Sequence, residues 1–205
     1  MLNESKRKSL RLPGYDYSQA GAYFVTICAQ ARKSLFGKVL GDEMHMNEYG
    51  RTLQDGWRKL PSHYPSIQLD YFTIMPNHVH GIIFLVGAGS PRPEIPSFPV
   101  GGKTPPLHVP NLSAIIGYFK FHSAKRINEI RHTPGAKVWQ RGFYDHVIRD
   151  DESLNRIRNY ILTNPSRWHL DRENSAAPNR DDFDIWLDSY KASLSIKKSS
   201  IRSMD

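Results

Sequence analysis

Residues 71–86, with the sequence YFTIMPNHVHGIIFLV, contain the two strongest strand signals in the chain. Segments 71–74 and 79–86 are rich in β-branched and aromatic residues, which favour strands. Residues 75–77, Met-Pro-Asn, separate them. Because a proline cannot occupy a central position in a hydrogen-bonded ladder, we expect a tight turn there. This stretch therefore predicts two neighbouring strands joined by a short connection, which is typical of an antiparallel sheet.

Further elements extend from this pair in both directions. The predicted strands lie at 23–29, at 35–40 and within 137–148, and the predicted helices at 47–60, 111–130, about 151–164 and, more weakly, 182–194. Asn111 and either Asp150 or Asp151 are suited to begin two of the helices. Since strands and helices intermix and short turns join neighbouring strands, we predict an α+β fold. Its expected architecture is a ferredoxin-like sandwich, a mainly antiparallel sheet with helices on one face.

Composition divides the chain into three parts. We predict a basic N-terminal arm at 1–21, a folded domain at 22–170, and a C-terminal extension at 171–205 with a weak helix and a basic tail. Residues 87–110 contain seven of the fourteen prolines and four glycines. Such a composition predicts a flexible loop inserted into the domain rather than a domain boundary.

The charge of the chain is positive and uneven. Its 28 Lys and Arg against 20 Asp and Glu give a formal net charge of +8 over 205 residues. Residues 111–149 alone carry seven basic and two acidic side chains. Clustered positive charge is typical of proteins that bind polyanions such as nucleic acids, although it also occurs on ordinary solvated surfaces.

The sequence argues against a membrane-spanning protein, a secreted protein and one held together by disulfides or a cysteine-based zinc site. The longest run without a polar side chain is 81–89, whereas a membrane-spanning helix needs about 20 apolar residues. The first residues, MLNESKRKSLRL, lack the apolar core of a secretory signal, so we expect a protein of the cytoplasm. The single cysteine, Cys28, excludes an intrachain disulfide and a cysteine-based zinc cage.

Two histidines, His78 and His80, begin the second strand of the opening stretch. Side chains alternate along a strand, so both project from the same face. Two imidazoles at this spacing can bind one divalent metal ion. The rest of the strand is apolar on both faces, so a pair of hydrogen-bonded structural histidines is the alternative.

The helix predicted at about 151–164 carries a second group of polar candidates. Tyr160 and Asn164 are spaced i and i+4, so they share a helix face at the edge of the buried stripe, and Arg156 lies one turn earlier. That edge can hold a side chain and still present it to a substrate. A half-buried tyrosine and an asparagine that caps the helix end are the structural alternative.

These features occur in a characteristic order. MPNHVHGII at 75–83 is followed by a basic amphipathic helix, by WQRGFYDHVIR at 139–149 and by YILTNP at 160–165. In order and spacing they resemble the single-tyrosine HUH endonucleases, specifically the REP-associated tyrosine transposases of bacteria, from about residue 21 to residue 168. The departures are the long proline-rich insertion and the extended C-terminus.

The resemblance implies an HUH nuclease fold and a set of roles. His78, His80 and Asn164 match the metal ligands, with Mg²⁺ or Mn²⁺ as cofactor, and Tyr160 matches the catalytic nucleophile. The implied activity is that of an endonuclease and strand transferase, a transposase that forms a 5′-phosphotyrosine intermediate. The implied partner is single-stranded DNA with a hairpin from a palindromic repeat. The resemblance leaves open whether a monomer or a homodimer binds it. The implied location is the bacterial nucleoid in the cytoplasm, and no membrane is involved.

Other side chains are candidates for contacts with phosphate or DNA. They are Arg156, Arg149, His146, Lys120, Lys125 and Arg126. Cationic side chains can follow a phosphate backbone, and aromatic side chains can stack on unpaired bases. Solvent exposure for Arg156 and a bracing role in the strand for His146 and Arg149 are the alternatives. We expect Trp139 to lie in the core.

Three other functions compete with the tyrosine nuclease. The first is a DNA-binding protein that does not cut, a regulatory or domesticated relative of the same family. The second is a metal-dependent hydrolase that uses an activated water and leaves no covalent adduct. The third, a structural protein without enzymatic activity, is hard to reconcile with the histidine pair and the basic segments.

Overall fold

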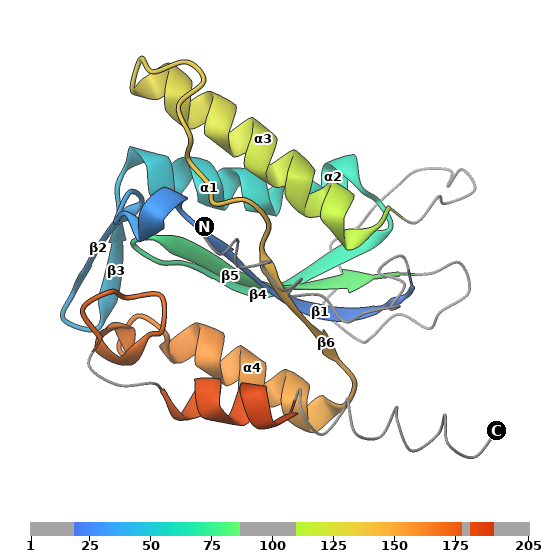
Figure 1. Ribbon diagram of the computed structural model, residues 1–205. Coiled ribbons are helices and arrows are strands. Elements are labelled where there is room, and N and C mark those ends of the chain that lie inside the picture. Colours follow the sequence, from blue (N-terminus) through green and yellow to red (C-terminus); the bar gives the residue numbers. More distant parts are fainter. Residues whose placement is uncertain (1–18, 87–109, 178–180, 191–205) are drawn as a thin grey trace, which may run out of the picture.

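The centre of the fold is a four-stranded antiparallel sheet (Figure 1). The computed structural model describes residues 19–86, 110–177 and 181–190. The strands are β1 (Gly21–Cys28), β4 (Ile67–Ile74), β5 (His78–Leu85) and β6 (Tyr144–Ile148), and they lie in the order β4-β5-β1-β6. The opening stretch of the sequence thus forms β4, the turn and β5, an antiparallel pair as predicted.

Helices and a small hairpin complete the fold. The helices are α1 (Glu48–Arg58), α2 (Leu60–His63), α3 (Leu112–Ile130), α4 (Asp151–Thr163) and a helix at 182–190, with short 3₁₀ turns at Gln30–Arg32 and Trp168–Leu170. The hairpin pairs β2 (Gly37–Leu40) with β3 (Glu43–Met46), and β3 was not predicted. The main elements follow one another along the chain as β1-α1-β4-β5-α3-β6. This order is the βαββαβ unit of ferredoxin-like folds, so the predicted α+β class is confirmed.

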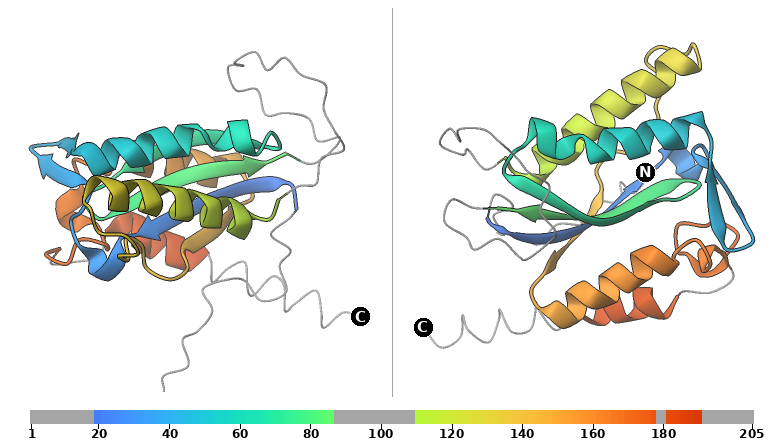
Figure 2. Two further views of the ribbon diagram at one scale, coloured as in Figure 1. Left: turned by 90° about the horizontal axis from the view of Figure 1, so that it is seen from above. Right: turned by 180° about the vertical axis from the view of Figure 1, so that it is seen from behind.

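The prediction that helices cover one face of the sheet is right for α1 and α3 but wrong for α4. Figure 1 and Figure 2 show α1 and α3 on one side of the sheet and α4 with the helix at 182–190 on the other. The physical reason is that the central strands are apolar on both faces, so the second face also has to be covered. Tyr23 and Val25 of β1 pack in the cluster under α1 and α3, whereas Phe24 packs with Ile157 of α4.

The helix starts follow the predicted capping. The side chain of Asn111 accepts a hydrogen bond from the backbone N–H of Ala114 at 2.9 Å. Asp150, rather than Asp151, caps α4, and its carboxylate accepts from the N–H of Ser153 at 2.7 Å. Each cap satisfies a backbone donor that the first helical turn leaves without a partner.

Parts of the predicted organisation lie outside the described residues, namely 1–18 of the arm, 87–109 of the insertion and 191–205 of the tail. The described part of the C-terminal extension packs on the same sheet as the rest of the domain: Phe183 and Leu187 are buried in the cluster with α4. Among the described helices, none has the length and apolar character that crossing a membrane requires.

A glycine in the histidine strand allows α1 to approach the sheet closely. A Cβ atom at Gly81 would lie 2.3 Å from Cζ2 of Trp57. The Trp57 ring is fully buried between Phe72 and Phe119, so it has little room to move. We therefore expect Gly81→Ala to lower the free energy of unfolding by about 1–3 kcal/mol, the usual cost of overpacking a core.

Gly117→Ala is the matched control. A Cβ atom there meets nothing within 4 Å on the exposed face of α3. Because alanine favours helix over glycine, this change should stabilise the protein by up to about 1 kcal/mol. Urea unfolding of both variants measures the change in the free energy of unfolding. Equal stability of Gly81→Ala and wild type would show that the Trp57 ring can move at little cost in free energy.

Candidate metal and tyrosine site

His78 and His80 are buried on the sheet face that α4 covers, with ring centroids 4.3 Å apart. Antiparallel pairing places Thr26 opposite His80, and the Thr26 Oγ1 lies 2.8 Å from Nδ1 of that ring. Nδ1 of His78 lies 2.8 Å from Oδ1 of Asn77, whose amide nitrogen donates to the backbone carbonyl of Glu173. Oδ1 of Asn77 is therefore the acceptor, so His78 carries its proton on Nδ1. This tautomer leaves the Nε2 lone pair of His78 available as a metal ligand.

Tyr160 is directed from α4 towards the same point. Its ring stacks on Phe183 with centroids 3.7 Å apart and meets Phe24 edge-on. Its hydroxyl donates to Oδ2 of Asp171 at 3.2 Å and lies 3.3 Å from Nε2 of His80. The predicted nucleophile and one of the predicted metal ligands are thus within hydrogen-bond distance.

Asn164 follows the last residue of α4 and is fully buried. Its amide nitrogen donates to Oδ2 of Asp171 at 2.7 Å. Its Oδ1 is buried without a hydrogen-bond partner in the structure, and so is Nε2 of His78. Buried polar atoms are nearly always satisfied, so two buried atoms without a hydrogen-bond partner, on residues that both lie beside Asp171, fit the ligand set of a metal ion.

Asp171 is a member of the site that sequence reasoning missed. It follows the 3₁₀ turn Trp168–Leu170 and is fully buried. Its Oδ2 lies 3.7 Å from Nε2 of His78 and 3.8 Å from Nε2 of His80, and these three residues form a candidate metal-binding group. It lies beyond the helix-ending proline, so no helical or strand periodicity connects it with Asn164, and nothing in the sequence distinguishes it from the other acidic residues of this segment.

Burial and neighbouring charges set the protonation of the site. Burial lowers the pKa of His78 to about 3, against the opposing effect of Asp171, so the imidazole is neutral. Burial, reinforced by the negative charge of Asp171, raises the pKa of Tyr160 well above its ordinary value. Burial alone would raise the pKa of Asp171, but His78, His80 and the hydrogen bond from Asn164 hold it below its ordinary value. The resting site therefore pairs a neutral His78 imidazole and a neutral Tyr160 phenol with the Asp171 carboxylate.

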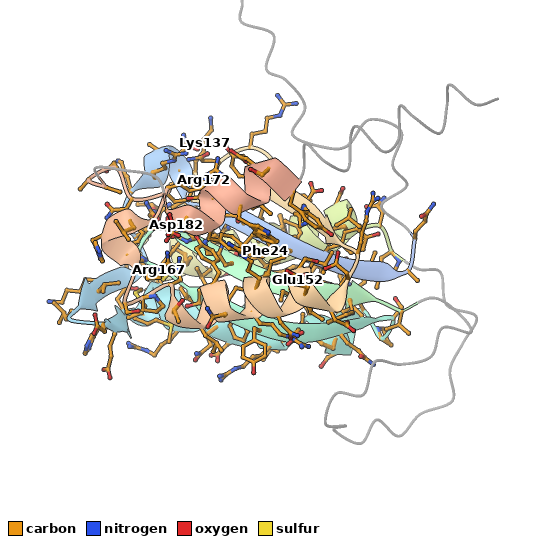
Figure 3. All side chains as sticks on the ribbon, turned by 90° about the horizontal axis from the view of Figure 1, so that it is seen from below. Phe24, Lys137, Glu152, Arg167, Arg172 and Asp182 are labelled. Atoms are coloured by element: carbon orange, nitrogen blue, oxygen red, sulfur yellow. The ribbon has the colours of Figure 1, made fainter. Side chains whose placement is uncertain are left out.

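The site is enclosed by the segment that follows α4. Tyr160 is only 2% exposed. A cavity beside it, lined in part by His80, Phe183 and Asp184, has a volume of about 20 Å³, which is room for one water and not for a phosphodiester. Figure 3 views the molecule from this side, where Phe24 and Arg172 are labelled. A substrate can therefore reach the Tyr160 hydroxyl only if some of the residues that line this cavity move.

The other predicted contact residues are distributed over both faces. Arg156 is exposed on α4, with its guanidinium 4.7 Å from the centre of the Trp186 ring. Arg149 is exposed at the end of β6, and His146 is buried on β6 with its ring against Tyr190. All three lie in elements on the α4 side or at the sheet edge, and none is in the hydrogen-bonded group around Tyr160.

The basic residues of α3 lie across the sheet from the site. Lys120 donates to two backbone carbonyls of the loop before β6, each at 2.7 Å, which ties that loop to the helix. Lys125 and Arg126 are exposed on α3. The structure therefore does not bring these three residues together with Tyr160. Trp139 is buried, as expected, and its indole N–H donates to Oγ of Ser123.

Comparison with known proteins identifies the relatives of the chain. No family model matches it. It is 34% identical over 170 residues to a protein of Haemophilus influenzae described as uncharacterized, covering 81% of this chain and 92% of that protein. It is 23% identical over 159 residues to a second protein of H. influenzae, described as "Putative REP-associated tyrosine transposase", covering 73% of each.

A solved structure shares the fold. It is described as the structure of a REP-associated tyrosine transposase bound to a REP hairpin, and it matches 75% of this chain and 72% of that one with a TM-score of 0.50 at 18% identity. The sequence relationships and the shared fold agree with the resemblance inferred from the sequence. In sequence and in fold the chain is therefore similar to REP-associated tyrosine transposases.

Proposed function

We propose that the chain is a metal-dependent single-stranded DNA endonuclease and strand transferase that acts on hairpin-containing repeat DNA. The observation that supports this most directly is the convergence of the Tyr160 hydroxyl with the two histidines and Asn164 in one buried site. The candidate nucleophile and the candidate ligands come from β5 and α4, which are far apart in the sequence.

The donor atoms suit a divalent cation. Imidazole nitrogens and an amide oxygen accept Mn²⁺ readily, whereas Mg²⁺ prefers oxygen ligands alone. His78, His80 and Asn164 would hold the ion, and the unsatisfied atoms of His78 and Asn164 support that assignment. Bound there, the ion would act as a Lewis acid towards the negative oxygens of a scissile phosphate.

Tyr160 would make the covalent bond. Its Oη attacks phosphorus, the bond from phosphorus to the 3′ oxygen breaks, and the products are a 5′-phosphotyrosine and a free 3′-hydroxyl. The reverse attack by another 3′-hydroxyl restores a phosphodiester and transfers the strand. If Nε2 of His80 bound the ion, it could no longer accept a hydrogen bond from the Tyr160 hydroxyl. The carboxylate of Asp171 would then be the acceptor and would orient that hydroxyl.

DNA contacts follow from the charges on both sides of the sheet. Arg149, Arg156 and His146 are candidate contacts for a DNA strand that enters the Tyr160 site. Lys120, Lys125 and Arg126 would contact DNA only where it extends past the sheet edge. The related solved structure contains a REP hairpin, so hairpin DNA is the first substrate to test. Such a protein would act at the bacterial nucleoid.

The test is an incubation of the purified protein with labelled single-stranded DNA that carries imperfect palindromes, with Mn²⁺, followed by a denaturing gel. A slow-moving band that survives denaturation is the expected covalent adduct. DNA binding without a band would favour the relative that does not cut, and cleavage without a band would favour a hydrolase that uses water.

A further inference from the structure

We propose that Asp171 is a direct ligand of the metal ion, so that a carboxylate joins His78, His80 and Asn164. The inference rests on the proposed metal site and adds a residue that lies outside the sequence motifs. It changes the chemistry of the site, because a carboxylate introduces a full negative charge among ligands that are otherwise neutral.

The position of the carboxylate supports direct coordination. Oδ1 of Asp171 accepts a hydrogen bond from the backbone N–H of Glu173 at 2.7 Å, which anchors one oxygen and directs the other towards the histidines. Oδ2 is nearly equidistant from the two Nε2 atoms, at 3.7 Å from His78 and 3.8 Å from His80. Atoms bound to one ion at about 2.0–2.2 Å are roughly 3–4 Å apart, so these spacings fit a shared cation.

The charge of the site leads to the same conclusion. Asp171 is fully buried, and a buried carboxylate without a positive partner is costly. Among the described residues its ion-pair partners are the two histidines, and a histidine that binds metal is neutral. The arginines of this region pair with other acids, since Arg32 and Arg172 contact Glu173. A divalent cation is the group that would balance the charge of Asp171.

The hydrogen bonds of Oδ2 also prepare the neighbouring ligand. By accepting from the amide nitrogen of Asn164, Oδ2 fixes the orientation of that side chain and leaves Oδ1 of Asn164 as a free ligand atom. A residue that only oriented Asn164 would make the same hydrogen bond without binding the ion. The two roles differ in their effect on metal affinity and on the stability of the metal-free protein.

Asp171→Asn separates them, because it keeps the size of the side chain and removes its charge. Mn²⁺ binding to the full chain is measured by isothermal titration calorimetry, and thermal unfolding is followed in EDTA and in Mn²⁺. A lost ligand should weaken Mn²⁺ binding by at least about 100-fold, beyond the roughly 10–100-fold expected for an orienting partner. The melting temperature in EDTA should equal or exceed that of wild type, and the gain on adding Mn²⁺ should shrink.

Glu173→Gln is the matched control. Glu173 is a buried carboxylate two residues away that contacts Arg32 and Arg172 and is outside the ligand group. Its replacement should leave the Mn²⁺ affinity within about threefold of wild type and should lower the melting temperature, because it breaks a buried ion pair.

The outcomes keep this inference distinct from the proposed nuclease. Two results for Asp171→Asn would overturn the ligand role of Asp171. One is a loss of Mn²⁺ affinity smaller than about 100-fold. The other is a melting temperature in EDTA below that of wild type. The nuclease proposal would still stand if wild type forms the adduct. Conversely, wild type that binds Mn²⁺ through Asp171 but forms no adduct would contradict the nuclease and leave the ligand in place.

Discussion

Tyr160→Phe should abolish the covalent protein–DNA adduct, with a loss in rate of at least about 10³-fold, the scale seen when a catalytic nucleophile is removed. The phenylalanine ring keeps the stacking on Phe183 and the edge contact with Phe24, so the fold should survive. What disappears is the Oη atom that would attack phosphorus. The measurement is the denaturing gel with labelled hairpin DNA and Mn²⁺, together with a binding assay that shows DNA affinity close to that of wild type.

Tyr190→Phe is the matched control. Tyr190 lies on the helix at 182–190, on the same side of the sheet as Tyr160, and its hydroxyl donates to the carboxylate of Asp150 at 2.6 Å. This variant should form the adduct at a rate close to that of wild type. An adduct that persists in Tyr160→Phe and is lost in Tyr190→Phe would place the nucleophile at Tyr190.

Removal of the metal should have an effect of similar size. EDTA should abolish adduct formation in wild type, and Mn²⁺ in excess should restore it, because the phosphate oxygens then regain their Lewis acid. His78→Ala should be inactive with or without added Mn²⁺, since it removes a ligand whose tautomer the Asn77 side chain fixes. Both are checked on the same gel with a time course.

His169→Ala controls for the loss of a histidine. His169 is exposed in the 3₁₀ turn just before Asp171, so its side chain has no place in the buried site. It should respond to EDTA and Mn²⁺ as wild type does. Adduct formation that survives thorough chelation would remove the metal role of His78, His80 and Asn164 altogether.

Much of the site could be predicted because its parts are local. The alternation of side chains along a strand places His78 and His80 on one face wherever β5 packs. The helical repeat does the same for Tyr160 and Asn164, and the caps at Asn111 and Asp150 depend only on neighbouring residues. Each of these relations spans a few residues, so no tertiary information is needed to recognise it.

That His78 and His80 lie close to Tyr160 and Asn164 was expected only from the resemblance to HUH endonucleases. No periodicity connects a strand at residue 78 with a helix at residue 160. The contact between the Tyr160 hydroxyl and His80 exists because α4 covers the second face of the sheet, where Phe24 and Ile157 share a core. A helix pattern shows which of its sides is apolar, but not which surface that side will cover.

Only the tertiary structure shows that Asp171 belongs to the site, that Phe183 covers Tyr160, and that Lys125 and Arg126 lie away from the site. Asp171 follows an irregular turn, whose path depends on packing and not on a repeat. Phe183 reaches Tyr160 only because residues 181–190 fold back onto the sheet. The sequence by itself determined the pairing of β4 with β5, the helix starts at Asn111 and Asp150, and the shared faces of His78 with His80 and of Tyr160 with Asn164, because these follow from short-range stereochemistry. Burial, charge balance and access depend on contacts between distant segments, and only the folded chain contains those.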